Sequence, residues 1–283
     1  KPNKEVPNVK EIPLEGVTLR KHQVRAGNAM LKKKHGVLWA ATNSGKTETA
    51  IAVIKALDLP TLFLVKGKDL VLQTYKRFQK RLGEEEIGLV MSNKWDVRKF
   101  TVASADTLAR RLSPNKIGNN THARQQAVKK LLASVQVVIV DECHTAASKG
   151  LWNVVRMCEA PYRYGLSGTP FKRGDKQDLK LIGLTGEVCC KITNKEMIED
   201  GVSAPTDIRF FDISTPDLTK VRDYKDVYDL GVVKNPERNR VICELTENYY
   251  MSGKSVLVIV KKIDHGHRLD HLLYEFKEDA FVP

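Results

Sequence analysis

The chain has 283 residues, of which 42% are hydrophobic, and this length predicts two compact units with apolar cores. No segment is long and apolar enough to be expected in a membrane, and no N-terminal run has the order of a signal peptide, so a cytoplasmic location is expected. The formal net charge of +13 favours a polyanionic partner such as nucleic acid, with solvated surface lysines as the alternative.

The five cysteines have no spacing typical of a metal site, which predicts reduced thiols and no zinc. The chain begins with Lys1 instead of Met and ends on an apolar run at Pro283, so we expect it to be part of a longer polypeptide. Residues 1–18 are rich in Lys, Pro and Val without periodicity, and they predict an extension or linker.

Strands and helices are expected to alternate after residue 18. Short apolar runs predict strands buried on both faces at 37–39, 61–65, 87–91, 100–103, 135–140 and 162–166. Helical patterns end at Lys34 and before Leu59, and others cover 70–82, 107–112 and 125–132, while 113–121 has the composition of a loop. This alternation predicts an α/β fold in which helices cover both faces of a parallel sheet.

The segment Ala40-Ala-Thr-Asn-Ser-Gly-Lys-Thr47 follows a strand and leads into a helix, which is the context that makes a phosphate-loop match specific. Backbone N–H groups at the start of that helix can hold phosphates, and the helix dipole adds to the attraction. Lys46 would reach the outer phosphates and the Thr47 hydroxyl would ligate magnesium. Asn43 stands where a residue that tolerates left-handed backbone geometry is useful.

Two further segments point to the same edge of the sheet. The apolar strand before Asp141 and Glu142 would place both carboxylates at the carboxyl edge, where parallel sheets bind ligands. Asp141 would hold magnesium and Glu142 would orient and deprotonate the attacking water. Ser167-Gly-Thr-Pro170 is a plain turn by composition, or a hydroxyl-rich bridge between a nucleotide site and a moving part.

In this order and spacing, the three segments resemble those of superfamily 2 helicases and translocases, and the resemblance extends from Leu19 to Leu273. It implies a first RecA-like domain at 19–203 and the beginning of a second, incomplete RecA-like domain at 204–283, with a strand at Ser255–Val260. The residues are most similar to phage recombination helicases of the UvsW type, whose relatives include XPB-like proteins and type I or III restriction translocases. For a phage protein, the cytoplasm would be that of the host.

The resemblance also implies roles for individual residues. ATP would be bound by Arg20, Gln23, Thr42, Asn43, Ser44, Gly45, Lys46 and Thr47, with Gln23 on the adenine and magnesium held by Thr47 and Asp141. Catalysis would rest on Lys46, Asp141, Glu142 and His144, and Ser167 with Thr169 would couple the site to domain closure. DNA, single-stranded or branched, would be bound through its phosphates by Lys68, Gln73, Ser104 and Thr107.

The expected function is an ATP-dependent DNA helicase or translocase in recombination, replication or repair. Lys66 departs from the proline usual in these proteins, as Ser104 does from threonine and Asp106 from glutamine, and this leaves the strand contacts open. The late arginine-bearing motif of the superfamily does not occur, so we expect the chain to bind ATP but to hydrolyse it poorly. The alternatives are an RNA helicase and a nucleotide-switched, non-motor subunit of a nuclease complex.

Overall fold

A computed structural model of the chain describes residues 7–113, 121–146, 148–171 and 178–279. The chain divides into two compact units, Lys1–Pro205 and Thr206–Pro283. None of the helices in the described part is long and apolar enough to cross a membrane. The loop predicted at 113–121 falls almost entirely outside the described residues.

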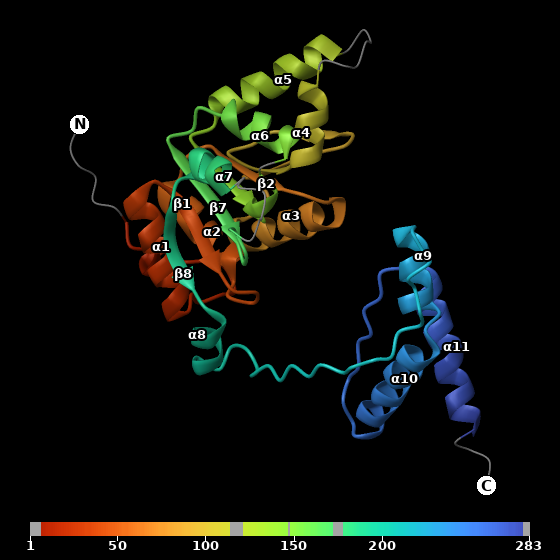
Figure 1. The fold of residues 1–283 in the computed structure, drawn as a ribbon. Helices are drawn as coiled ribbons and strands as arrows, with labels where there is room; N and C mark the ends of the chain where they lie inside the picture. Colours follow the sequence, from red (N-terminus) through yellow and green to blue (C-terminus); the bar gives the residue numbers. More distant parts are fainter. Residues whose placement is uncertain (1–6, 114–120, 147, 172–177, 280–283) are drawn as a thin grey trace. The chain divides into compact units, whose positions relative to one another are not determined.

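An eight-stranded sheet forms the centre of the first unit (Figure 1). Its strands are β1 (His35–Ala40), β2 (Thr61–Val65), β3 (Ile87–Met91), β4 (Lys94–Asp96), β5 (Phe100–Ser104), β6 (Val137–Asp141), β7 (Tyr162–Ser167) and β8 (Val188–Ile192). They lie in the order β4-β3-β5-β2-β6-β7-β1-β8, and only the β3–β4 pair is antiparallel. The predicted parallel α/β sheet is therefore confirmed.

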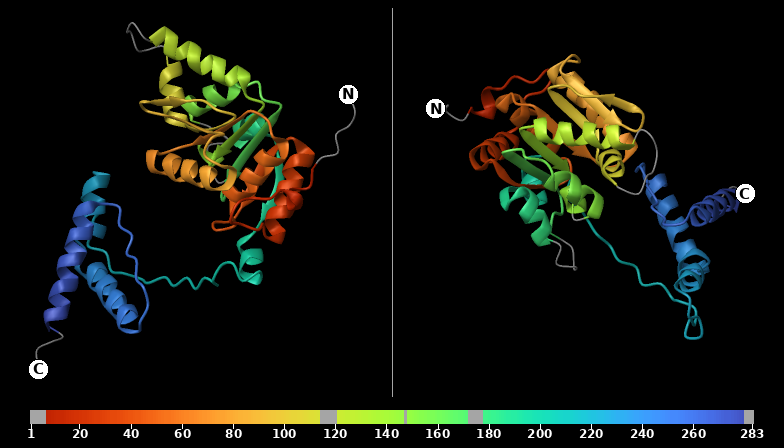
Figure 2. Two further views of the ribbon diagram at one scale, coloured as in Figure 1. Left: turned by 180° about the vertical axis from the view of Figure 1, so that it is seen from behind. Right: turned by 90° about the horizontal axis from the view of Figure 1, so that it is seen from above.

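Helices cover both faces of this sheet, and two views show the same layering (Figures 1 and 2). One layer contains α1 (Lys21–Lys33), α2 (Lys46–Leu57) and α3 (Lys68–Leu82). The other contains α4 (Ala105–Leu112), α5 (Thr121–Ser134), α6 (Lys149–Arg156) and α7 (Asp178–Thr185). A short helix, α8 (Asn194–Glu199), and two 3-10 turns at Val9–Glu11 and Cys143–Thr145 complete the unit.

Part of the predicted extension at residues 1–18 packs on the first unit. Val9 is fully buried, and its backbone N–H donates to Asn28 Oδ1 of α1 at 2.9 Å. Gly27 of α1 makes room for it, because a Cβ there would lie 2.8 Å from a Val9 methyl. Leu14 is buried in the same core, so widely spaced apolar side chains anchor the segment without a helical or strand period.

The parallel pairing brings five strand ends to one edge of the sheet. Trp39 of β1 pairs with Ser167 of β7, and Asp141 of β6 pairs with Leu166. Val65 of β2 pairs with Ser104 of β5, so the segments that follow these strands start at the same edge. The phosphate loop, the carboxylate pair and the Ser-Gly-Thr-Pro turn therefore all lie at this edge, at the ends of β1, β6 and β7.

The sequence patterns missed several elements of the first unit: β4, β8, α6, α7 and α8. β4 is three residues long, and β8 is an edge strand that pairs only with β1, so neither needs the continuous apolar run of a central strand. The helices are six or eight residues long, which is too short for a clear helical period.

Helices are the regular elements of the second unit in its described residues, and non-helical segments precede and connect them. It contains α9 (Tyr224–Tyr228), a π-helical turn at Asp229–Val233, α10 (Pro236–Met251) and α11 (Ile263–Asp279). Asn239 of α10 is buried and accepts from His265 Nε2 of α11 at 2.9 Å. Burial lowers the pKa of His265 and so favours the neutral ring, whose proton must lie on Nε2 to donate to Asn239 Oδ1.

The strand predicted at Ser255–Val260 is wrong. The segment is extended but pairs with no strand, and Leu257 and Ile259 are 83% and 85% exposed. A β-strand is stabilised by its neighbours, and the described part of the second unit offers none. An apolar run shows that a segment could form a strand, but a strand forms only where a neighbouring strand is available for pairing.

Candidate nucleotide-binding site

The phosphate loop has a backbone that only a few residue types accept. Asn43 has φ 64° and Gly45 has φ 75°, both in the left-handed region, as the sequence predicted for Asn43. Gly45 is the N-cap of α2, so the loop ends on free backbone N–H groups at a helix start. The Lys46 ammonium donates to Ala40 O at 3.2 Å, which closes the loop across its mouth.

Gln23 holds the loop from the side of α1. Its Oε1 accepts from Arg20 N at 2.8 Å, and its Nε2 donates to Ser44 O at 3.2 Å. A Cβ on Gly45 would stand 2.1 Å from Gln23 Nε2 and would displace this amide, and the φ of 75° would in addition strain any other residue. Gln23 is buried, and the predicted contact with adenine would need its amide to turn from the loop.

The carboxylate pair lies where β6 ends. Glu142 has φ 45° and ψ 54°, a left-handed conformation that costs a non-glycine residue about 1–2 kcal/mol. This turn sends Glu142 in a new direction directly after Asp141, and the Glu142 N–H donates to Asp141 Oδ1 at 3.0 Å. The two carboxyl groups therefore serve one site from adjacent positions.

The loop and the carboxylates line one open cavity of about 310 Å³. Its lining residues are Asn43, Gly45, Lys46, Thr47, Arg77, Asp141 and Glu142. Six of them were predicted from the sequence, and Arg77 of α3 was missed. The basic face of α3 offers four cations at 76, 77, 80 and 81, and only the docking of the helix shows which one faces the cavity.

Glu48, the residue after Thr47, fixes the arginines of α3 next to the loop helix. Arg81 Nε and Nη2 lie 3.0 and 3.3 Å from the two Glu48 carboxylate oxygens. Arg77 Nε is 3.9 Å from Glu48 Oε1, a looser contact that leaves its guanidinium available to the cavity. Glu48 is only 14% exposed, so the pair with Arg81 is an anchor between α2 and α3.

The predicted coupling residues form one hydrogen-bonded group. Ser167 Oγ lies 3.0 Å from His144 Nδ1 and donates to Glu142 Oε2 at 3.4 Å, while His144 Nδ1 is 3.2 Å from Glu142 Oε2. The backbone N–H of Thr169 donates to Ser167 Oγ at 3.1 Å. The carboxylate facing the cavity is thereby connected to the Ser-Gly-Thr-Pro turn.

Thr47 and Asp141 present the oxygen donors that magnesium prefers. In the described part of the chain, no three His, Cys, Asp or Glu side chains cluster as a metal site. Magnesium in nucleotide sites takes one or two protein ligands and completes its shell with phosphate and water oxygens, so these residues fit it. Burial, and then the charge of Glu142, raise the pKa of Asp141, as expected for a carboxylate that awaits a cation.

The four residues predicted to contact nucleic acid separate into two pairs. Lys68 and Gln73 of α3 are exposed. Ser104 and Thr107 are buried, and both side chains serve the fold: Ser104 Oγ caps α4 by accepting from Thr107 N, and Thr107 Oγ1 accepts from Ser92 N. Each hydroxyl oxygen thus already accepts a backbone N–H group, and a phosphate could be bound only through the remaining hydroxyl proton, so the contact of these two residues with DNA stays a prediction.

Comparison with known proteins finds one family model that covers much of the chain and several similar helicases and translocases. The family model of the type III restriction enzyme, res subunit, matches residues 16–172, more than half of the chain. Residues 226–283 match the model of the DNA polymerase III chi subunit, HolC. The predicted resemblance to superfamily 2 helicases of the UvsW and XPB types is confirmed.

Three curated relatives illustrate the similarity. The DNA 3'-5' translocase XPB2 of Sulfurisphaera tokodaii is 27% identical over 181 residues, covering 64% of this chain and 37% of that protein. A putative ATP-dependent RNA helicase of Acanthamoeba polyphaga mimivirus is 24% identical over 290 residues, covering 94% and 49%. The ATP-dependent DNA helicase uvsW of Enterobacteria phage T4 is 22% identical over 149 residues, covering 51% and 30%.

The similarity to UvsW extends to the fold. A crystal structure of T4 UvsW matches with a TM-score of 0.52 at 14% identity, covering 94% of this chain and 53% of that one. The chain thus spans between about a third and half of the length of the curated relatives it matches.

The raised pKa of Asp141 predicts that this carboxylate destabilises the nucleotide-free protein. A carboxyl group with a raised folded-state pKa keeps its proton to higher pH in the folded chain, so stability is lost as pH rises from the unfolded pKa through the folded one. We therefore expect Asp141→Asn to raise the free energy of unfolding at pH 8 by about 1 kcal/mol. The gain should shrink as the pH is lowered.

Denaturant unfolding at several pH values measures this effect. Glu159→Gln, which neutralises an exposed carboxylate of the same unit, is the matched control and should change stability little. A loss of stability in Asp141→Asn at pH 8 would show that the ionised carboxylate is stabilised by its surroundings instead.

Proposed function

Because the chain belongs to the type III restriction enzyme res subunit family, we propose that it is the ATP-binding part of a helicase or translocase acting on DNA. Its processes would be recombination, replication or repair, and its location the cytoplasm. The observation that supports this most directly is that one cavity at the sheet edge is lined by Lys46, Thr47, Asp141 and Glu142 together. These are the residue types that phosphoryl transfer needs, gathered from two separate segments.

ATP would lie with its phosphates on the loop. Backbone N–H groups at the start of α2 and the Lys46 ammonium would hold the phosphates, and that requires Lys46 to release its contact with Ala40 O. Thr47 and Asp141 would hold magnesium, which when bound neutralises phosphate charge. Glu142 would orient the attacking water and accept its proton. His144 and Ser167, which contact Glu142, would couple nucleotide binding and hydrolysis to the conformation of the turn at 167–170.

Arg77 would contribute a cation to the same site. It lines the cavity beside Asp141, and its charge opposes the rise in the Asp141 pKa. A guanidinium there would stabilise the negative charge of the outer phosphates. The arginine-bearing motif of related motors does not occur in this chain, so Arg77 would assist binding without replacing that arginine in catalysis.

DNA would be bound through its backbone phosphates near the start of α3. Lys68 and Gln73 are exposed there, next to the end of β2, and the net charge of +13 supplies the general attraction. Phosphate contacts do not read sequence, which suits a motor that must move along any sequence.

Two alternatives remain from the sequence. An RNA helicase is supported by the similarity to the mimivirus protein, whereas the match of residues 226–283 to a DNA polymerase III subunit favours DNA. A nucleotide-switched, non-motor subunit need not keep the hydrolytic carboxylate, and the presence of Glu142 in the cavity with Lys46 and Asp141 argues against it.

Nucleotide binding by this chain tests the proposal. Lys46→Ala should weaken the binding of a fluorescent ATP analogue with magnesium by about 10- to 100-fold, because a charge-assisted contact to phosphate is lost. Lys32→Ala, which removes an exposed lysine of α1, is the control and should leave the affinity unchanged. Equal affinity in both variants would place the nucleotide away from the loop.

The Arg77 assignment predicts a difference between nucleotides. Arg77→Gln should weaken ATP binding about threefold to tenfold more than ADP binding, because ADP lacks the phosphate nearest the carboxylates. Calorimetric titration of both nucleotides measures this, with Lys80→Gln on the same helix as the control. Equal losses for ATP and ADP would contradict an outer-phosphate contact.

The Lys68 assignment predicts a change in salt dependence. Lys68→Gln should lower the slope of log K against log salt for single-stranded DNA by about 0.7, the value for one phosphate contact. Fluorescence anisotropy over a salt series measures the slope, and Lys129→Gln on α5 should leave it unchanged. Tighter binding to RNA of the same sequence than to DNA would favour the RNA helicase.

A further inference from the structure

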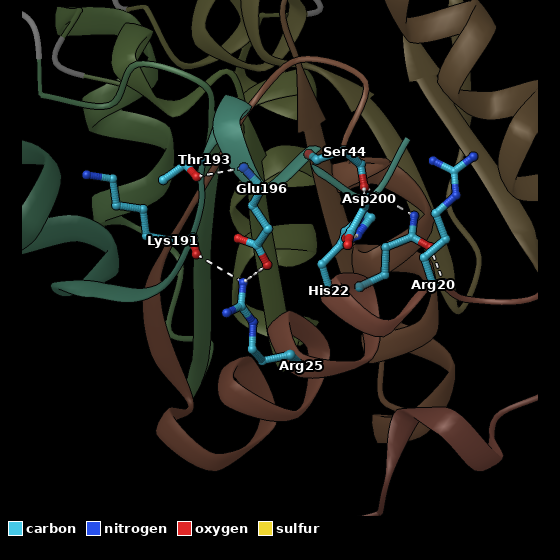
Figure 3. Close-up of polar contacts among 9 residues, drawn as sticks. Arg20, His22, Arg25, Ser44, Lys191, Thr193, Glu196 and Asp200 are labelled. Carbon is cyan, nitrogen blue, oxygen red and sulfur yellow. Dashed lines mark hydrogen bonds and ion pairs between the residues drawn. The ribbon is translucent and has the colours of Figure 1, made fainter. Parts of the chain in front are cut away.

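Two ion pairs attach the last part of the first unit to α1 (Figure 3). Arg25 Nη2 lies 2.6 Å from Glu196 Oε1 of α8, and His22 Nδ1 lies 3.3 Å from Asp200 Oδ2, directly after α8. We call residues 194–205 the exit segment, because the first unit ends at Pro205. The exit segment is therefore held on the same helix that carries Gln23.

The two pairs differ in their burial and in the second contact that the α1 residue makes. The Arg25 side chain is 53% exposed, and it also donates to Lys191 O of β8, beside the exit segment. The His22 side chain is 1% exposed, and its second nitrogen, Nε2, lies 3.2 Å from Ser44 O in the phosphate loop. Only the His22 pair connects the exit segment to the nucleotide site.

Both ring nitrogens of His22 face hydrogen-bond acceptors. Asp200 Oδ2 and Ser44 O are both hydrogen-bond acceptors, so a ring with a proton on each nitrogen donates to both, while a neutral ring donates to one. Ser44 O also accepts from Gln23 Nε2. Ser44 Oγ is buried without a partner in the described structure, so the loop is held here through its carbonyl.

Asp200 lies in a well-defined part of the exit segment. Its N–H donates to Glu196 O at 2.9 Å and ends α8, and the N–H groups of Val202 and Ser203 both donate to Met197 O. Met197 is fully buried. The position of the Asp200 carboxylate therefore depends on the exit segment being docked as a whole.

We propose that His22 and Asp200 are positioning residues of the nucleotide site, through which the docked exit segment holds the phosphate loop in its binding conformation. The inference rests on the proposed binding of nucleotide at this loop. The new element is that the exit segment, which leads to the second unit, contributes to that site. By linkage, nucleotide that binds more tightly when the segment is docked stabilises the docked segment by the same factor.

The test compares the two ion pairs in the whole chain. Asp200→Ala should weaken binding of a fluorescent ATP analogue with magnesium about threefold to tenfold, and Glu196→Ala should change it less than twofold. Asp200→Asn should restore most of the affinity, because its amide can donate to Nδ1 while Nε2–H still faces Ser44 O. His22→Phe combined with Asp200→Ala should bind no worse than His22→Phe alone, since both act through one contact.

Hydrogen exchange supplies a readout that needs no nucleotide. In the free protein, Asp200→Ala should speed exchange in peptides covering residues 41–47, and Glu196→Ala should not, although both loosen α8. Thermal melting of each variant confirms that the unit is folded.

Equal effects of Asp200→Ala and Glu196→Ala on loop exchange would overturn the inference, because general loosening of the exit segment would then explain both. No effect of either variant would also overturn it, because the His22 contact would then not hold the loop. Failure of the unaltered chain to bind nucleotide would instead refute the proposed function. In that case the exchange comparison would still decide whether Asp200 holds the loop.

Discussion

Parallel strand pairing is the constraint on which the rest of the first unit depends. Because β1, β6 and β7 run in the same direction side by side, the segments that follow them start at one edge. Residues about a hundred positions apart in the chain, such as Lys46 and Asp141, can then line one cavity. The helices on either face bury the sheet, but the direction of the strands decides where the chemistry lies.

The site contains residues whose conformation or burial is unfavourable for the free energy of folding. Asn43 and Glu142 adopt left-handed backbone conformations, and Asp141 is held where its charge is poorly solvated. Such strain persists when surrounding contacts determine the conformation, and here Gln23, Ser167 and the paired strands supply them. The loop and the carboxylates would therefore already be oriented for an incoming nucleotide, and Asp141 would gain a cation that solvates its charge.

The central strands and the loop residues could be predicted from sequence because their patterns are local. Apolar runs identified β2, β3 and β6, and the spacing around Lys46 identified the phosphate loop. Arg77 and His22 could not be found in this way, because helix docking selects one cation among several and brings Asp200 to a histidine 178 positions away. Ser104 shows the opposite limit, since a residue expected at a surface is used as a helix cap.

The extended run at 256–260 has a consequence for handling the protein. It combines β-branched and aliphatic side chains, has no proline, and exposes Leu257 and Ile259 without a strand beside them. Segments of this kind stack with copies of themselves and lead to aggregation at high protein concentration. Lys254 precedes the run and Lys261 follows it, and charged residues in these positions oppose such stacking. Ionic strength would then govern solubility, because added salt screens the lysines that keep the chains apart.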